Sequence, residues 1–219
     1  MTARSANPRE VDMPDHEATP LAARAVRRAL APREAVAHEE VRRLLDAALE
    51  VMRESGTSPP KVADIVAASG LSNQTFYRHF AGRDDLVAAV VEAGALRLVD
   101  YVDHQMGKAA PDDSEGRVRI WIESVLSQST RPAVAQATRA VMWNFRQLPR
   151  DGGPGDRWGG VAALLLQPLR AMGSPDPPRD AEAIAELVFG RLEHHLWVVA
   201  PTTTDVEHLV GFCLRAVRR

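Results

Sequence analysis

The stretch from Lys61 to Asp85 constrains the fold more than any other part of the sequence, because it carries the pattern of two short helices joined by a tight turn. One apolar stripe at helical spacing marks the first helix, and it consists of Val62, Ile65 and Val66. Gly70 ends this helix, since glycine readily adopts the left-handed conformation that closes many helices. Ser72 is a natural N-cap for the second helix. The pattern predicts a helix-turn-helix.

The second helix of this stretch has one apolar face and one polar face. Phe76 and Phe80 are four residues apart, so they share a face that packs inward. The opposite face and its edges carry groups that hydrogen-bond to base edges or phosphates, namely Asn73, Gln74, Thr75, Tyr77 and Arg78. Arg83 opens the next helix, where its charge and the exposed backbone N–H groups favour a phosphate contact.

Between His38 and Ala93 the chain resembles the DNA-binding domain of the TetR family of transcriptional regulators. The resemblance rests on Val62, Asp64, Ile65, Ala68, Gly70, Leu71, Ser72, Thr75, Phe76, Tyr77, His79, Phe80, Arg83, Asp85 and Leu86. Its most specific part is the Tyr-x-His-Phe run that closes the second helix. The sequence departs from the family pattern at Pro60, Asn73 and Gln74, so the surface expected to read bases differs from the one usual in the family.

The resemblance and the residue chemistry together predict a DNA-binding set of Lys61, Ser72, Asn73, Gln74, Thr75, Tyr77, Arg78, His79 and Arg83. Gln74 and Asn73 are the candidates for reading bases, since an amide can pair with both N6 and N7 of adenine. The resemblance places Tyr77, His79 and Arg83 against phosphates. Arg78 suits a guanine or a phosphate, and Thr75 suits either role. The alternative for His79 is a partly buried position that closes the three-helix core.

Composition limits where DNA could bind. The 219 residues are 45% hydrophobic and 26% charged, and the net charge of -2 argues against a protein that coats nucleic acid nonspecifically. From Ser58 to Arg83, however, three basic residues stand against the single acid Asp64, so the candidate site is locally basic. The single cysteine, Cys213, suits a reducing compartment. No run is apolar enough for a membrane span or a secretion signal, which predicts a cytoplasmic location.

The amino-terminal residues 1–37 are rich in proline, alanine, arginine and acids and lack a periodic apolar pattern. They are expected to be a largely disordered tail, with at most a helical stretch around Leu21 to Leu30. The alternative is a basic arm that reaches into a minor groove through Arg24, Arg27, Arg28 and Arg33. From His38 an amphipathic helix follows and completes a three-helix unit over residues 38–84.

Residues 85–219 are predicted to be helical throughout, which makes the fold class all-α. A long helix runs from Arg83 to about Met106, and five further helical segments are separated by glycine- and proline-containing breaks. This region is expected to bind an effector and to dimerise. The segment from Asp180 to Val199 has a wide apolar arc, and the segment from Val206 to Val217 is amphipathic. Together they predict a dimer interface containing Ile184, Leu187, Val188, Leu209, Val210 and Cys213.

Large flat side chains are concentrated in the second half of the chain. In a regulator resembling the TetR family such residues often line an effector pocket, and the candidates are Trp121, Met142, Trp143, Phe145, Arg146 and Phe189. The alternative for each is ordinary helical core. No catalytic motif is visible. Adjacent helical residues diverge by about 100 degrees, so His194 and His195 are poorly placed to share a metal ion. No cofactor is expected.

The sequence therefore predicts a ligand-responsive repressor that binds a palindromic operator as a homodimer and is released by a small effector. One alternative is a DNA-binding protein with a helical oligomerisation domain and no small-molecule sensing. A remote alternative is a small all-helical enzyme.

Overall fold

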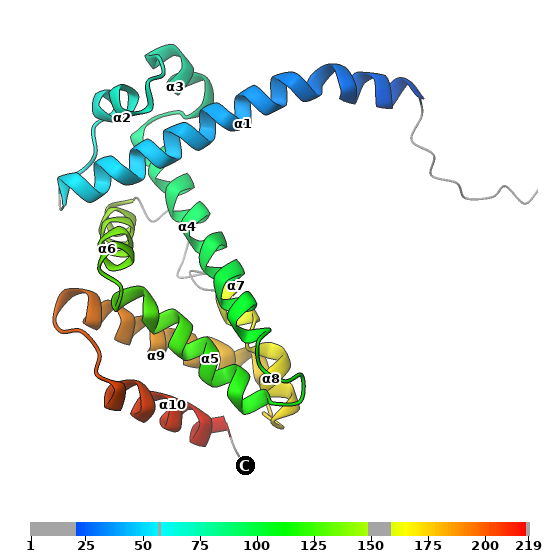
Figure 1. Cartoon of the computed structure of the whole chain (residues 1–219), viewed down its shortest axis with the longest axis vertical. Coiled ribbons are helices and arrows are strands. Elements are labelled where there is room, and N and C mark those ends of the chain that lie inside the picture. Colours follow the sequence, from blue (N-terminus) through cyan, green and yellow to red (C-terminus); the bar gives the residue numbers. More distant parts are fainter. Residues whose placement is uncertain (1–20, 57, 149–158, 218–219) are drawn as a thin grey trace, which may run out of the picture. The chain divides into compact units, whose positions relative to one another are not determined.

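The computed structural model describes residues 21–56, 58–148 and 159–217. Helices are the regular elements in these ranges (Figure 1), and they are α1 (Leu21–Ser55), α2 (Val62–Ser69), α3 (Asn73–His79), α4 (Arg83–Met106), α5 (Ser114–Leu126), the 3-10 turn η1 (Ser127–Ser129), α6 (Pro132–Gln147), α7 (Gly159–Ala163), α8 (Leu166–Ala171), α9 (Pro177–Trp197) and α10 (Thr203–Val217). The predicted all-α class is confirmed.

Helix α1 begins earlier than the sequence analysis expected. It starts at Leu21, contains Pro32 and continues to Ser55, so residues 21–37 are helical rather than disordered. Proline usually interrupts a helix because it lacks an N–H group. Pro32 is exposed, and water can satisfy the carbonyl that loses its partner. Residues 1–20 lie outside the described residues.

A first hydrophobic cluster holds the helix-turn-helix together. It combines side chains of α1, α2, α3 and the start of α4, including Leu44, Ile65, Phe76 and Leu86, all of which are fully buried. The apolar stripes predicted for these helices therefore converge on one core. Ala140 of α6 belongs to the same cluster, so this core is closed partly by a helix from the second half of the chain.

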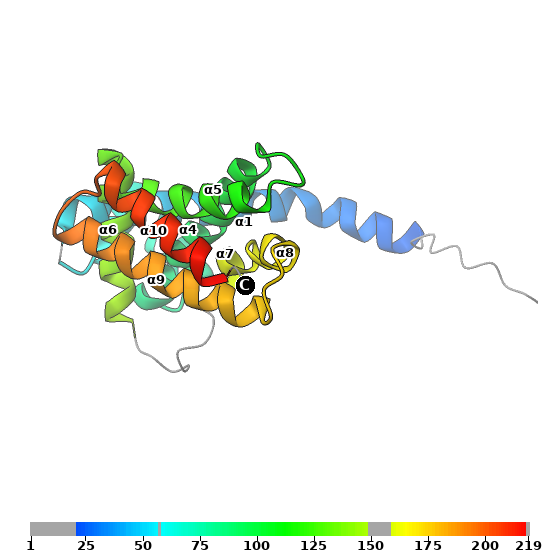
Figure 2. The ribbon, with the colours of Figure 1, turned by 90° about the horizontal axis from the view of Figure 1, so that it is seen from below.

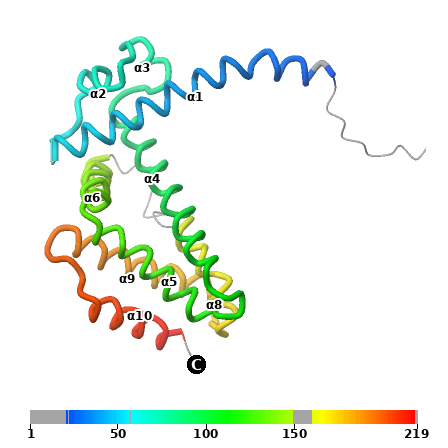
Figure 3. Tube along the Cα trace, in the orientation of Figure 1, coloured from blue at the N-terminus to red at the C-terminus, as the bar shows by residue number. Residues whose placement is uncertain are grey.

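Helix α4 connects this cluster to a second one. Its first turns contribute Val87 and Val90 to the first cluster, and its last turns contribute Val102 and Met106 to the second. Figure 3 traces α4 from the end of α3 to the loop that precedes α5. The predicted span of this helix is confirmed.

The second cluster fills the space between α5, α8, α9 and α10. Trp121 of α5 lies at its centre, fully buried, and its indole Nε1 donates a hydrogen bond of 2.8 Å to the carbonyl of Val161. Helices α9 and α10 both pack on α5, and Figure 2 shows these three helices side by side. Within the described helices, none combines the length and apolar character needed to cross a lipid bilayer.

The five segments predicted after α4 are present, with one difference. The segment after residue 158 is divided into α7 and α8 at Leu164 and Leu165. Pro168 explains the division, because it has no N–H to donate to the carbonyl of Leu164, as a continuous helix would require.

Compact packing divides the chain between Glu39 and Glu40, and residues 40–219 form one unit. The boundary expected between residues 84 and 85 falls inside α4, where the chain passes from one hydrophobic cluster to the other.

Candidate functional site

The turn between α2 and α3 has the capping geometry that the sequence predicts. Gly70 has a φ of +64°, and Ser72 is the N-cap of α3. The Ser72 hydroxyl accepts a hydrogen bond of 3.1 Å from the backbone N–H of Thr75. A cap of this kind stabilises a helix by about 1 kcal/mol. Arg43 of α1 donates a 2.6 Å hydrogen bond to the carbonyl of Ser69 and so secures the end of α2.

Helix α3 buries one face and exposes the other. Phe76 is fully buried and Phe80 nearly so, which fixes the helix on the first cluster. Replacing a buried phenylalanine by alanine typically costs 3–5 kcal/mol, so roughly that cost would follow loss of Phe76. The exposed side chains are those predicted to face DNA: Asn73, Gln74, Tyr77 and Arg78. Thr75 and His79 are half-buried, at the edge of this surface.

An acidic residue of α1 holds the end of α3. The Glu40 carboxylate lies 2.8 Å from Nε2 of His79 and accepts a hydrogen bond of 2.5 Å from Arg78. These two contacts lower the pKa of Glu40 below its ordinary value, and the contact with His79 has the larger effect. The His79 side chain is only 12% exposed, which is the core-closing position weighed as the alternative to phosphate binding.

The start of α4 contains a second local ion pair. The Arg83 Nε donates a hydrogen bond of 2.7 Å to the carboxylate of Asp84. Asp85 accepts a 2.9 Å hydrogen bond from the N–H of Ala81, which joins the residue before the N-cap to the first turn of α4. Lys61 is exposed and precedes α2 as its N-cap. Two of the three cations counted in the sequence, Arg78 and Arg83, are therefore paired with acids.

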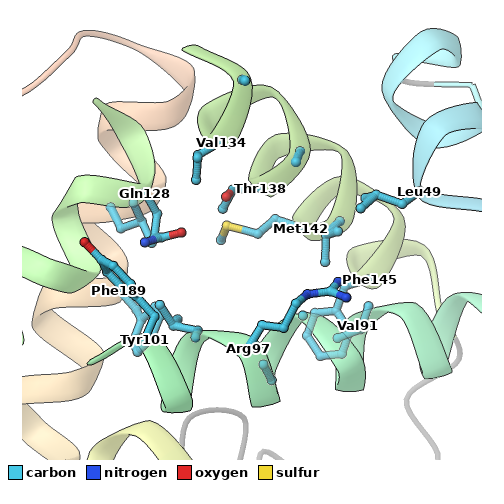
Figure 4. Close-up of a pocket in the computed structure, with 17 residues that line it drawn as sticks. Leu49, Val91, Arg97, Tyr101, Gln128, Val134, Thr138, Met142, Phe145 and Phe189 are labelled. Carbon is cyan, nitrogen blue, oxygen red and sulfur yellow. The ribbon is translucent and has the colours of Figure 1, made fainter. Parts of the chain in front are cut away.

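A cavity of about 430 Å³ lies between α4, α6 and α9 (Figure 4). Its lining consists of Leu49, Val91, Gly94, Ala95, Arg97, Leu98, Tyr101, Gln128, Ala133, Val134, Ala137, Thr138, Val141, Met142, Phe145, Phe189 and Leu192. The volume lies within the range of about 300–1,000 Å³ that is typical of small-molecule sites. Most of the lining is apolar, and a few polar groups project into it.

Three of the six predicted pocket residues line this cavity: Met142, Phe145 and Phe189. The other three lie elsewhere. Trp121 is core, and its ring packs edge-on behind Phe189 at a centroid distance of 6.3 Å. Trp143 packs against Trp197 at 6.0 Å. Arg146 forms an ion pair with Glu193 of α9.

Sequence reasoning missed the contribution of α4 to the cavity. Arg97 and Tyr101 line it from that helix, and Gln128 and Thr138 complete its polar groups. A signal was present, because Val91, Ala95, Leu98 and Tyr101 form a second apolar stripe at helical spacing along α4.

Helix α6 touches both the cavity and the helix-turn-helix core. Val141 lines the cavity and also packs against the first cluster, in which the neighbouring Ala140 is buried. The Arg139 guanidinium donates a 3.0 Å hydrogen bond to the carbonyl of Leu196, which fastens α6 to the end of α9. Helix α6 is therefore one element through which a ligand would contact the DNA-binding part, and Leu49 of α1, which also packs on the first cluster, lines the cavity directly.

The side chains predicted for a dimer interface are mostly interior. Ile184, Val188, Leu209, Val210 and Cys213 are all buried in the second cluster of a single chain, and Leu187 is half-buried. They hold α9 and α10 in place and present little surface to a partner. The apolar surface that these helices and the following turn expose comes from Trp197, Val198, Val199 and Phe212.

The two adjacent histidines of α9 face different surroundings. His195 is buried and its Nδ1 lies 2.9 Å from the carbonyl of Val199, whereas His194 is exposed. Within the residues that the structure describes, no three His, Cys, Asp or Glu side chains gather closely enough to hold a metal ion.

Residues 44–90 match the family model described as bacterial regulatory proteins, tetR family. Over 60 residues the chain is 36% identical to an uncharacterised helix-turn-helix transcriptional regulator of Bacillus subtilis strain 168, and this match spans 27% of the chain and 31% of that relative. The chain thus matches less than a third of its curated relative.

Two solved structures share the fold over most of their length. A TetR-family regulator from Streptomyces coelicolor is 23% identical with a TM-score of 0.62, and the match covers 86% of this chain and 96% of that one. A TetR-family regulator from Mesorhizobium loti is 16% identical with a TM-score of 0.61, covering 83% and 96%. The helix-turn-helix of residues 44–90 is thus of the tetR type, and the chain has the fold of a TetR-family transcriptional regulator.

Proposed function

We propose that this protein is a ligand-responsive transcriptional repressor that binds a near-palindromic operator as a homodimer and leaves it when a small effector occupies the cavity. The helix-turn-helix supports the DNA-binding part of the proposal. Its exposed face carries Asn73, Gln74, Tyr77 and Arg78 on a helix whose opposite face is anchored by Phe76.

The observation that carries the sensing part is the position of α6. Val141 borders the cavity and packs on the helix-turn-helix core, so a ligand that displaces α6 also changes the support of α3. A ligand shifts such an equilibrium only if it binds one arrangement more tightly than the other. In the proposed mechanism the effector favours an arrangement in which the two heads no longer match successive major grooves.

Phosphate and base contacts have separate roles in the proposed complex. Gln74 and Asn73 read bases, while Tyr77 and Arg83 hold phosphates, and Lys61 lies at the start of α2 within the basic stretch. Arg78 reaches DNA by exchanging the Glu40 carboxylate for a phosphate or a guanine. His79 keeps its contact with Glu40 and positions the end of α3.

The experiment begins with selection of bound sites from random double-stranded DNA. A near-palindrome with half-sites about one helical turn apart, or somewhat more, is the expected result. A panel of small molecules is then screened by thermal unfolding, because a ligand that binds only the folded protein raises the melting temperature. Hits are expected to weaken binding to the selected operator. Hits that stabilise the protein without affecting DNA affinity would contradict the proposed coupling.

Gly94 supplies a matched pair of variants for this experiment. It lines the cavity, and a Cβ placed there would meet no atom within 4 Å, so a larger side chain enters open space. Gly94→Leu is expected to fill part of the cavity and lower effector affinity while operator binding is retained. Gly94→Ala is the control, since it gives the same gain in helix propensity but adds only one carbon.

A protein that binds DNA without sensing is the second candidate function. The cavity argues against it, because a core that served only oligomerisation would have no need of a space of about 430 Å³. Operator binding that no panel compound alters, in wild type and Gly94→Leu alike, would favour this second candidate.

A further inference from the structure

The cavity has an asymmetric charge. Among the described residues that line it, Arg97 is the one that carries a charge, and none is an aspartate or a glutamate. Among the described residues Arg97 forms no ion pair, and Asp100, one turn further along α4, is exposed to solvent. The guanidinium of this exposed side chain therefore adds a positive charge to a cavity whose other described lining residues are uncharged.

The polar groups lie at separate places around an apolar centre. Figure 4 shows Arg97 extending from α4 toward Phe145, while Gln128 and Thr138 point into the cavity from its other side. Met142, Phe145 and Phe189 supply much of the apolar wall between them. A ligand that matches both the positive charge of Arg97 and the apolar wall has an apolar body and one anionic group at its end.

We propose that the effector is an amphipathic monoanion, such as a medium-chain carboxylate, whose anionic group binds Arg97 and whose apolar body lies against Met142, Phe145 and Phe189. This inference rests on the proposed sensing function. Arginine suits this role because its planar guanidinium binds a carboxylate through two parallel hydrogen bonds. The apolar body contributes affinity in proportion to the area it removes from water. A cationic amphiphile of the same length is disfavoured by Arg97.

The test compares three probes that share one chain length and differ in charge: decanoate, decan-1-ol and decyltrimethylammonium. Binding to the full-length protein is measured by titration calorimetry, below the critical micelle concentrations of the two ionic probes and below the solubility limit of decan-1-ol. Decanoate is expected to bind roughly tenfold more tightly than decan-1-ol, as one charge-assisted contact allows, and decyltrimethylammonium is expected to bind most weakly. Raising the salt concentration reduces the advantage of decanoate.

Arg97→Gln is expected to remove the preference for decanoate while leaving the affinity for decan-1-ol unchanged. Arg170→Gln is the matched control, because Arg170 is exposed on α8 and does not line the cavity. Gly94→Leu is expected to weaken decanoate and decan-1-ol together, which shows that both occupy the cavity. The three variants thus separate the charge contact from the apolar contacts.

Three results would overturn the proposal: decan-1-ol binds as tightly as decanoate, the preference survives in Arg97→Gln, or none of the probes binds. The proposed function is measured separately in the same samples, by binding to the selected operator. If decanoate binds through Arg97 but operator affinity does not change, the ligand class stands and the sensing function fails. If another class of compound releases the operator, the function stands and the ligand class is wrong.

Discussion

The Glu40 carboxylate lies 2.8 Å from Nε2 of His79 and joins α1 to the last turn of α3. The same carboxylate oxygen also accepts a hydrogen bond from Arg78, which is exposed where His79 is not. One acid therefore has two functions. It fixes the end of the proposed recognition helix through its contact with His79. It also binds Arg78, which would have to exchange this carboxylate for a DNA group in the proposed complex.

Glu40→Gln is expected to lower the melting temperature near neutral pH. The folded state lowers the pKa of Glu40, so its carboxylate stabilises the fold at higher pH, and this stabilisation is lost as the pH falls through the lowered pKa. The difference between wild type and Glu40→Gln should therefore shrink below about pH 4. Thermal unfolding as a function of pH measures this difference in melting temperature, and Glu92→Gln at an exposed position of α4 is the control. A difference that grows on acidification would contradict the assigned contacts.

Gln74→Ala is expected to change sequence preference. Loss of a bidentate amide contact to adenine should cost about 1–3 kcal/mol on the best site and relax the preference at one base pair in each half-site. Binding titrations against the selected operator and its single-base variants measure this change. Gln147→Ala, at the exposed end of α6, is the control. Equal weakening on every sequence would place Gln74 on the DNA backbone instead.

Arg83→Ala is expected to weaken binding to all sequences alike. A lost phosphate contact should reduce the slope of log affinity against log salt by about one unit. Asp84→Asn is the informative partner variant, because it removes the carboxylate that holds Arg83 at 2.7 Å in the free protein. It should strengthen binding modestly on every sequence and steepen the salt dependence. A change of preferred sequence in Arg83→Ala would assign this side chain to a base.

Phe212→Glu is expected to weaken the proposed homodimer. Phe212 is 51% exposed on α10 and belongs to the apolar surface of the last two helices, whereas Leu209 is buried and its substitution would disturb the fold itself. Sedimentation should show wild-type dimer and Phe212→Glu monomer at micromolar concentration. Leu96→Glu, which alters an apolar residue of α4 that is 60% exposed, should remain dimeric. Monomeric wild type would rule out this interface.

Cys213 is expected to be unreactive in the folded protein. Burial raises the pKa of its thiol to about 11, so almost none is thiolate at neutral pH, and the surrounding side chains block access. A chromogenic disulfide reagent at pH 8 should label it slowly in buffer and rapidly in denaturant. Rapid labelling of the native protein would show that α10 opens readily from the second cluster.

Local signals made the helix-turn-helix predictable from the sequence. Gly70 and Ser72 fix the turn by their own backbone and side-chain chemistry, and the spacing of Phe76 and Phe80 fixes which face is buried. Each of these determinants lies within a few residues of the structure that it specifies. The expectation of a largely disordered tail differs from the structure over residues 21–37, where α1 is helical and continues through Pro32.

The cavity was only half predictable because its lining depends on how distant helices pack. Phe189 and Trp121 looked alike in the sequence, but their rings pack edge-to-face, and only that of Phe189 lines the cavity while that of Trp121 is core. Arg97 gave no signal, because it is an isolated arginine on the long helix predicted from Arg83 to about Met106. Its role depends on α6 lying opposite, which no local pattern encodes.

Under the proposed sensing function, the dual contact of α6 sets a rule for redesigning this protein as a biosensor. Substitutions on α6 that change ligand preference also disturb the neighbouring Ala140 and Val141, which pack on the first cluster. Libraries aimed at a new analyte are therefore better built at Gln128, which lines the cavity from η1 and belongs to neither cluster, than at Phe189 and Leu192, which are buried in the second cluster. Such libraries would change which ligand binds and would leave operator binding and its release intact. Randomising α6 would instead yield many variants that bind the new analyte but are no longer released from the operator by it.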